Sequence, residues 1–123
     1  MGLLISMRRT GDVTIVDLRG RSTLNPDESE LLSGHLEKLV GKGACKLLLN
    51  VSDLTQIDSS GVSIIVGTYV RLGRQGGALK LLRPRGRVLE VLSLFHLQKI
   101  IPSFEDEAQA LASFEPLSSL AVP

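Results

Sequence analysis

Residues 47–61 constrain the fold more strongly than any other part of the chain. The segment opens with the apolar run 47–51, which lacks regular polar alternation and so predicts a strand buried on both faces. A connecting segment follows over 52–57, and 58–60 (Asp-Ser-Ser) then supplies residues favoured at helix N-caps. From Val62 onward, apolar residues recur at helical spacing. A buried strand followed by a helix is the unit from which parallel sheets are built.

The helix that begins near residue 60 has one apolar face and one face of small or polar residues. The apolar face is expected to pack on the sheet, and it comprises Val62, Ile65, Val66, Tyr69 and Gly73, with Val70 and Leu72 flanking it. The opposite face comprises Ser60, Ile64, Gly67 and Arg71. Ile64 is a branched apolar residue on that face, and two interpretations of it remain open. In the first, it is incidentally exposed or contacts another element, as single apolar residues often do. In the second, it belongs to a docking patch beside the serines.

The segments before this unit predict a hairpin and a helix. Residues 3–7 and 13–18 are expected to pair as strands around the turn-forming cluster 8–12, and Gly20 is expected to close the second strand. A helix should then start with Asn25 as N-cap and Pro26 in the first position, and glycines at 41 and 43 should end it.

The segments after this unit continue the alternation of strands and helices. The expected elements are a strand over 78–82, a helix opened by Pro84, a strand over 99–101 ended by Pro102, and a last helix with Ser103 as cap and Asp106 at N3. This order predicts an α/β fold: one domain with a mixed, mostly parallel sheet packed with about four α-helices.

Apolar spacing also predicts which residues of these elements form the core. They are Val13, Ile15, Val16 and Leu18 in the hairpin; Leu31, Leu32, Leu36, Leu39 and Val40 in the first helix; Val88, Leu89, Val91, Leu92 and Phe95 in the third; and Phe104, Ala108, Leu111 and Ala112 in the last.

The length of 123 residues is that of one domain, which we expect over 1–115, with a flexible tail over 116–123. A net charge of +1 gives no electrostatic basis for binding nucleic acid or a membrane surface. Cys45 is the single cysteine, so an internal disulfide is excluded, and we expect a buried thiol in a reducing compartment. Neither a signal peptide nor a membrane-spanning run is recognisable, which predicts a cytoplasmic protein.

Few residues have the spacing that catalysis or cofactor binding requires. His35 and His96 have no partner at metal-ligand spacing, and Ser59 does not lie in the Gly-x-Ser-x-Gly motif of hydrolases. The segment 73–77 lacks the Lys and Ser/Thr of a phosphate-binding loop. We therefore expect no catalytic residue, no metal site and no cofactor. The basic cluster 83–87 is either a solvated helix start or a contact for an acidic protein surface or a phosphate.

Asp58-Ser59-Ser60-Gly61 allows two interpretations. In the first, its side-chain oxygens only cap the helix by accepting hydrogen bonds from the first amides. In the second, Ser59 is a regulatory serine. A phosphate there would add roughly −1.5 to −2 charges at a helix N-terminus, which the amides and the helix dipole tolerate. A partner docked over the same turn would instead face buried charge beside Asp58.

The stretch from Asp53 to Val62, together with the later Gly76-Gly77-Ala-Leu-Lys-Leu-Leu, resembles the bacterial anti-sigma factor antagonists of the STAS family. The resemblance runs from about Ile5 to Phe114 with the elements in the same order. It implies a small α/β domain that binds an anti-sigma factor and thereby releases a sigma factor. The anti-sigma factor of such systems is often a serine kinase that inactivates its antagonist, and a PP2C-type phosphatase usually reverses the modification.

The resemblance also implies roles for individual residues. Ser59, the first serine after the aspartate, corresponds to the phosphorylated residue, and Asp58, Ser60, Gly61 and Ile64 correspond to the partner-binding surface. The family commonly has an aspartate three positions after Gly20, close in space to the phosphorylated serine, where this chain has Thr23. We place Thr23 in the partner-binding surface as well, and expect the missing carboxylate to alter recognition by the kinase or phosphatase.

We therefore expect a non-enzymatic regulator, monomeric or weakly dimeric, that binds a kinase-type anti-sigma factor and is switched off by phosphorylation of Ser59. It should contact neither nucleic acid nor membrane directly. The alternative, kept open by Thr23, is a scaffold or sensor subunit that assembles with sister domains without releasing a sigma factor. A third interpretation, a phosphotransfer or nucleotide-hydrolysing enzyme, has no base, metal site or phosphate loop to support it.

Overall fold

The computed structural model describes residues 3–22 and 26–114, with side chains for 3–20 and 30–114. Thr23, Asn25 and the expected tail over 116–123 lie outside the described residues. The elements, in chain order, are β1 (Leu3–Thr10), β2 (Val13–Ser22), α1 (Pro26–Gly41), β3 (Lys46–Ile57), α2 (Ser59–Arg74), β4 (Ala78–Leu82), α3 (Gly86–Leu94), the short 3₁₀ helix η1 (Leu97–Lys99), β5 (Ser103–Phe104) and α4 (Glu107–Ser113).

The described strands form one five-stranded sheet in the order β1-β2-β3-β4-β5. β1 pairs with β2 in the antiparallel sense, and all the other neighbours are parallel. Each parallel pair is joined by a helical crossover, as parallel strands require. The predicted α/β fold with a mixed, mostly parallel sheet is therefore confirmed.

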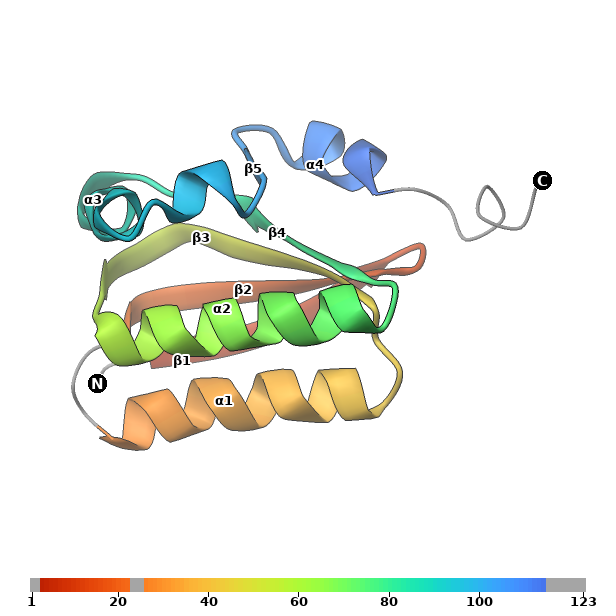
Figure 1. The fold of residues 1–123 in the computed structure, drawn as a ribbon, viewed down its shortest axis with the longest axis horizontal. Helices are drawn as coiled ribbons and strands as arrows, with labels where there is room; N and C mark the ends of the chain where they lie inside the picture. Colours follow the sequence, from red (N-terminus) through yellow and green to blue (C-terminus); the bar gives the residue numbers. More distant parts are fainter. Residues whose placement is uncertain (1–2, 23–25, 115–123) are drawn as a thin grey trace.

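Helices cover both sides of this sheet. α1 and α2 lie side by side (Figure 1), and together with α3 and η1 they pack on one face of the sheet, whereas α4 packs on the other face. The run Leu47-Leu48-Leu49 is fully buried, and its central residue belongs to a different apolar cluster from its two neighbours. The main cluster joins α1, α2 and α3 to the sheet. The smaller one lies under α4 and comprises Val13, Ile15, Leu48, Leu82, Ala110 and Phe114. The prediction that this strand is buried on both faces is confirmed.

β3 leads directly into the candidate site. The prediction that 52–57 is a connection is wrong, because β3 continues through it to Ile57. Leu54 and Ile57 are both buried, and they pair in parallel register with Gly20 and Ser22 of β2. β4 pairs only with the first part of β3, and α3 packs against the strand as well. Only one residue, Asp58, separates the end of this long strand from the start of α2.

The hairpin is longer than expected. Residues 8–10 are not part of the turn, since they pair with 13–15 and leave only Gly11 and Asp12 between the strands. Gly11 has a φ of +62°, which suits a two-residue turn. Gly20 does not close β2, which extends to Ser22.

The C-terminal elements are also shifted from their predicted positions. The strand expected over 99–101 is wrong: His96 takes a left-handed conformation after α3, η1 follows, and β5 starts only at Ser103. Ser103 does not cap the last helix. Asp106 does so, because its carboxylate accepts a hydrogen bond from the Gln109 amide at 3.0 Å. Pro84 precedes α3 by two residues instead of opening it.

The predicted core is correct for all four hairpin residues and for six of the fourteen residues predicted in helices. Six helix residues predicted inside are buried: Leu32, Leu36, Val40, Val88, Val91 and Leu92. Leu39, Phe104 and Leu111 are half-buried, whereas Leu31, Leu89, Phe95, Ala108 and Ala112 are exposed. In α4 the buried side chain is that of Ala110, and Phe114 follows the helix into the smaller cluster. Cys45, expected to be buried, is half-buried.

The buried face of α2 differs in part from the predicted one. Val62 and Ile65 are buried as expected, and so is the flanking Leu72, but Thr68 is buried too and Gly73 is exposed. α2 packs on α1 as well as on the sheet, so its buried face turns toward α1. Thr68 tolerates burial because its hydroxyl donates to the carbonyl oxygen of Ile64 at 2.8 Å.

Candidate functional site

The candidate site is the turn between β3 and α2, and Asp58 organises it. Asp58 has extended backbone angles (φ −116°, ψ −174°) and is the N-cap of α2. Its Oδ1 accepts hydrogen bonds from the amides of Ser60 at 3.1 Å and Gly61 at 3.2 Å, and from the Ser60 hydroxyl at 2.7 Å. Its carbonyl oxygen accepts the amide of Val62 at 3.0 Å. The structure confirms that the carboxylate is a helix cap.

The two serines of this turn have different environments. The Ser60 side chain is half-buried and its hydroxyl donates to Asp58. Ser59 is the first residue of α2 and is exposed, and no other described residue hydrogen-bonds its hydroxyl. Of the two, Ser59 is therefore the hydroxyl that another protein can reach.

The second carboxylate oxygen of Asp58, Oδ2, makes none of the hydrogen bonds described for Oδ1. Oδ2 is buried, and among the described residues it has no hydrogen-bond partner. A buried oxygen without a partner costs free energy, commonly about 1–3 kcal/mol. Negative charge is thus concentrated beside Ser59 and is compensated within the described residues only through Oδ1.

The start of α2 favours an anion electrostatically. The first amides of a helix point outward and carry partial positive charge, and no acidic residue lies in the first turn itself. Asp58 already uses two of these amides. A phosphate on Ser59 would therefore benefit from the helix dipole and lie close to an existing carboxylate.

Ile64 lies one turn further along α2. It is half-buried, and with Leu36, Val40, Gly67 and Arg71 it lines a hollow of about 240 Å³ between α1 and α2. Of the two earlier interpretations, contact with another element therefore holds. Ser59 and Ile64 are five residues apart, which places them ~140° apart around the helix. A direct role for Ile64 in docking remains a prediction.

Thr23 lies outside the described residues, but the strand leading to it ends at the site. Ser22, the last residue of β2, pairs with Ile57, the last residue of β3. β2 and β3 therefore finish at the same edge of the sheet as Asp58. The role of Thr23 in partner binding remains a prediction.

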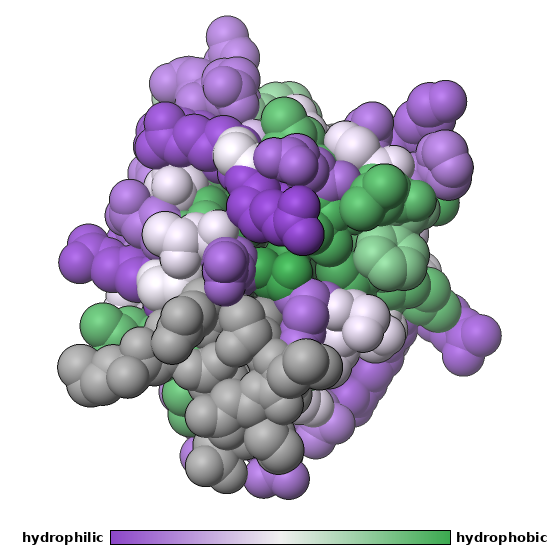
Figure 2. Space-filling model, turned by 90° about the vertical axis from the view of Figure 1, so that its left-hand side faces the viewer, coloured by the Kyte–Doolittle hydropathy of each residue, from purple (hydrophilic) through white to green (hydrophobic). Residues whose placement is uncertain are grey.

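The surface around this edge combines polar and apolar areas. Figure 2 shows the end of the molecule where α3 lies and α2 begins, and hydrophobic residues gather on the right of that view among hydrophilic ones. In and just after α3, Leu89, Leu94 and Phe95 are exposed, Leu94 to 73% of its surface. The basic cluster lies at the start of α3, where Arg85 donates to the Ser52 carbonyl at 3.4 Å and Arg87 pairs with Glu90.

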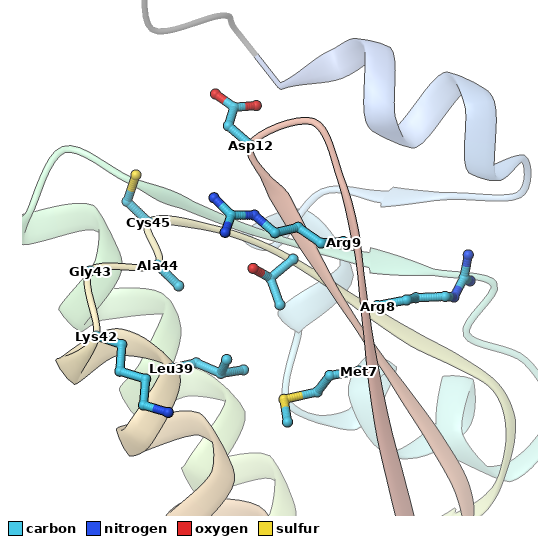
Figure 3. A pocket seen from close by; sticks show the side chains of 10 residues that line it. Met7, Arg8, Arg9, Asp12, Leu39, Lys42, Gly43, Ala44 and Cys45 are labelled. Carbon is cyan, nitrogen blue, oxygen red and sulfur yellow. The ribbon is translucent and has the colours of Figure 1, made fainter.

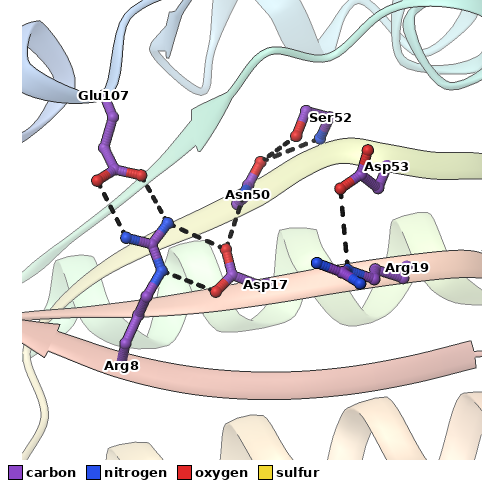
Figure 4. Close-up of polar contacts among 7 residues, drawn as sticks. All are labelled: Arg8, Asp17, Arg19, Asn50, Ser52, Asp53 and Glu107. Atoms are coloured by element: carbon purple, nitrogen blue, oxygen red, sulfur yellow. Dashed lines mark hydrogen bonds and ion pairs between the residues drawn. The ribbon is translucent and has the colours of Figure 1, made fainter.

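A polar network elsewhere on the sheet was missed by the sequence interpretation. Arg8 of β1 bridges Asp17 of β2 at 2.8 Å and Glu107 of α4 at 2.6 Å (Figure 4). Asn50 donates to Asp17 at 2.7 Å and in turn accepts from Ser52. Hydrogen bonds from Arg8 lower the pKa of both carboxyls, and those carboxyls raise the pKa of the guanidinium. An asparagine inside an otherwise apolar strand was the available signal for this network.

The described part of the chain contains no group of three His, Cys, Asp or Glu side chains that could hold a metal ion. None of its helices is long and apolar enough to cross a membrane.

The comparisons with known proteins agree on one family. The STAS domain model matches residues 5–110. The anti-sigma F factor antagonist of Paenibacillus polymyxa is 29% identical over 119 residues, covering 96% of this chain and 100% of that protein. An anti-sigma factor antagonist from Mycobacterium paratuberculosis has the same fold, with a TM-score of 0.82, 18% identity, and coverage of 92% of this chain and 94% of that one. The Bacillus cell fate determinant SpoIIAA in its phosphorylated form gives a TM-score of 0.70 at 21% identity, over 89% of this chain and 97% of its own.

Proposed function

The chain belongs to the STAS-domain family of anti-sigma factor antagonists, and we propose that it binds a kinase-type anti-sigma factor until phosphorylation of Ser59 prevents binding. Binding would release a sigma factor for transcription. The family consists of regulators that are not enzymes. The partners we propose are therefore an anti-sigma factor with serine kinase activity and a PP2C-type phosphatase that restores the unmodified serine.

The observation that carries this proposal is the difference between the two serines. Ser60 donates its hydroxyl to the cap, whereas Ser59 is exposed at the same helix start. A kinase needs a hydroxyl that it can reach without unfolding its substrate. Modifying Ser60 would break the hydrogen bond to Asp58, and modifying Ser59 breaks none among the described residues.

A phosphate on Ser59 should leave the domain folded. The helix dipole and the amides of the first turn favour the added anion, and the Ser59 side chain is not part of the core. Phosphorylated SpoIIAA has the same fold as this chain, so in that protein the fold and the modification coexist. The switch would thus act on the surface and not on stability.

The same phosphate should prevent docking. A partner that covers the start of α2 would remove the phosphate from water beside the Asp58 carboxylate, whose Oδ2 has no described partner. Burying two adjacent anions costs several kcal/mol unless cations pair with both. Thr23, Asp58, Ser60, Gly61 and Ile64 form the partner-binding surface in this proposal, with Ser59 in it.

The test is a capture experiment with the full chain as bait. Wild type, Ser59→Ala and Ser59→Asp are used on lysate of the source organism, with Ser103→Asp as a matched control that adds a carboxylate at an exposed serine far along the chain. We expect wild type, Ser59→Ala and Ser103→Asp to retain a kinase-type anti-sigma factor and Ser59→Asp to lose it.

Two other outcomes would count against the proposal. If all four baits retain sister STAS proteins and no such kinase, the scaffold or sensor function is favoured and Ser59 is only a helix residue. If the kinase is retained equally by all four baits, the protein binds an anti-sigma factor without a switch at Ser59.

A further inference from the structure

A second candidate site lies at the end of the sheet remote from Ser59. A pocket of about 570 Å³ opens between the β1–β2 hairpin, the end of α1 and the start of β3 (Figure 3). In Figure 1 this is the right-hand end, whereas α2 begins on the left. The volume lies within the range of about 300–1,000 Å³ that is common for small-molecule sites.

Two cations line this pocket without an ion pair to any described residue. Arg9 of β1 extends across it toward the start of β3, and Lys42 follows α1 on the opposite wall. Among the described residues neither makes a salt bridge or a hydrogen bond with an acidic side chain. The other charges of the lining are already paired: Arg8 with Asp17 and Glu107, and Asp12 with Lys46 at 2.7 Å. Figure 3 shows Arg8 pointing away from the pocket.

The remaining wall is mostly apolar. Leu39 and Ala44 are half-buried, and Met7 leaves 46% of its surface exposed although it lies on a strand beside the core. The pKa of Asp12 is lowered mainly by its hydrogen bond from Lys46 and further by the nearby charge of Arg9. The pocket therefore presents two positive charges that form no ion pair with a described residue, above an uncovered aliphatic wall. Guanidinium groups bind carboxylates and phosphates through paired hydrogen bonds, and the wall suits an aliphatic group.

From this combination we propose that the pocket binds a small amphipathic oxyanion, a carboxylate or phosphate group carried on an aliphatic body. Arg9 and Lys42 hold the oxyanion, and Met7, Leu39 and Ala44 cover the aliphatic part. The site is separate from the proposed Ser59 switch, since it lies at the opposite ends of β3 and α1. A ligand there would give this regulator a second input.

The single cysteine makes occupancy measurable. Cys45 lines the pocket and is half-buried, so its alkylation by iodoacetamide can be followed by intact mass. Hexanoate and hexyl phosphate are the probes, and hexanol, hexylammonium and inorganic phosphate are the controls for charge and for the aliphatic part. We expect at least one of the two oxyanions to slow alkylation in a saturable manner, while hexanol and hexylammonium do not and inorganic phosphate does so only at higher concentration. The oxyanion that protects at lower concentration identifies the head group.

Substitutions assign the effect to the pocket. Arg9→Gln and Lys42→Gln should each raise the concentration for half-protection about tenfold, because each removes a charge-assisted hydrogen bond to the oxyanion. Lys99→Gln removes one positive charge from an exposed position in η1 and should change nothing. All three side chains are exposed, so the variants should fold. The proposal is overturned if neither oxyanion protects Cys45, if hexanol protects equally well, or if Lys99→Gln weakens protection as much as Arg9→Gln.

Discussion

Replacing Asp58 tests whether the candidate site is also a structural cap. Asp58→Ala removes the Oδ1 atom that accepts from two backbone amides and one hydroxyl. Loss of an N-cap side chain costs about 0.5–2 kcal/mol, and three donors on one charged oxygen favour the upper half of that range. We expect Asp58→Ala to lower the free energy of unfolding by about 1–2 kcal/mol. For a chain of 123 residues this corresponds to a Tm lowered by about 4–8 °C.

Asp58→Asn is the matched control, because it keeps the accepting Oδ1 and removes only the charge. Oδ2 accepts no hydrogen bond from any described residue, so an amide nitrogen in its place would break none of the described contacts. Asparagine caps helices about as well as aspartate, so Asn should restore most of the loss. Urea unfolding of the three proteins, followed by circular dichroism, gives the comparison. The reasoning is refuted if Asp58→Ala is as stable as wild type, or if Asn is as damaging as Ala.

Two further predictions concern packing and pH. A Cβ at Gly77 would overlap the carbonyl oxygen of Cys45, so Gly77→Ala should lower the free energy of unfolding by at least about 2 kcal/mol. A Cβ at Gly67 in α2 would have no heavy atom within 4 Å beyond its chain neighbours and the backbone of its own helix, so Gly67→Ala should raise it by about 0.5–1 kcal/mol. Urea midpoints that moved in the same direction would contradict this. The pKa values of Asp17 and Glu107 are lowered by Arg8, so the stability they contribute is present above the unfolded pKa of about 4 and is lost as pH falls through the folded values. Glu107→Gln should therefore lower the free energy of unfolding by under about 1 kcal/mol at neutral pH, because the Arg8–Glu107 pair is partly exposed. It should also flatten the decline of stability in acid. An unchanged dependence of stability on pH would count against the network.

The sequence predicted the parts of the fold in which a local pattern and tertiary packing agree. The apolar run at 47–49 and the helix start at 58–60 were interpreted correctly, because a strand buried on both faces and a group of N-cap residues each have a local signal. The strand over 78–82 was placed with the observed bounds. The family followed from the residues between Asp53 and Val62.

The misplaced elements depended on contacts between distant segments. Arg8 and Arg9 resemble turn residues, yet they belong to β1, where Arg8 is held by Asp17 and by Glu107, 99 residues away. The segment 52–57 has polar residues typical of a loop, yet pairing with the end of β2 makes it strand. Thr68 is buried only because α1 packs beside α2, which no pattern within α2 reveals.

The exposure of Ser59 was also beyond local pattern. Asp58, Ser59 and Ser60 are all suitable caps, and only the structure shows that Asp58 is the cap and that Ser60 donates to it. Sequence resemblance pointed to Ser59 without giving the physical reason. The structure adds that Ser59 is exposed at the helix start, which supports the proposal that Ser59 is the regulated serine.

The most direct test of the account is the dissociation constant of the captured anti-sigma factor for wild type, Ser59→Ala and Ser59→Asp, measured by isothermal titration calorimetry. We expect Ser59→Ala to bind like wild type. We expect Ser59→Asp to bind at least about tenfold more weakly, which corresponds to ~1.4 kcal/mol, with an unchanged urea midpoint. Equal affinity of all three folded proteins would contradict the claim that charge at Ser59 controls binding.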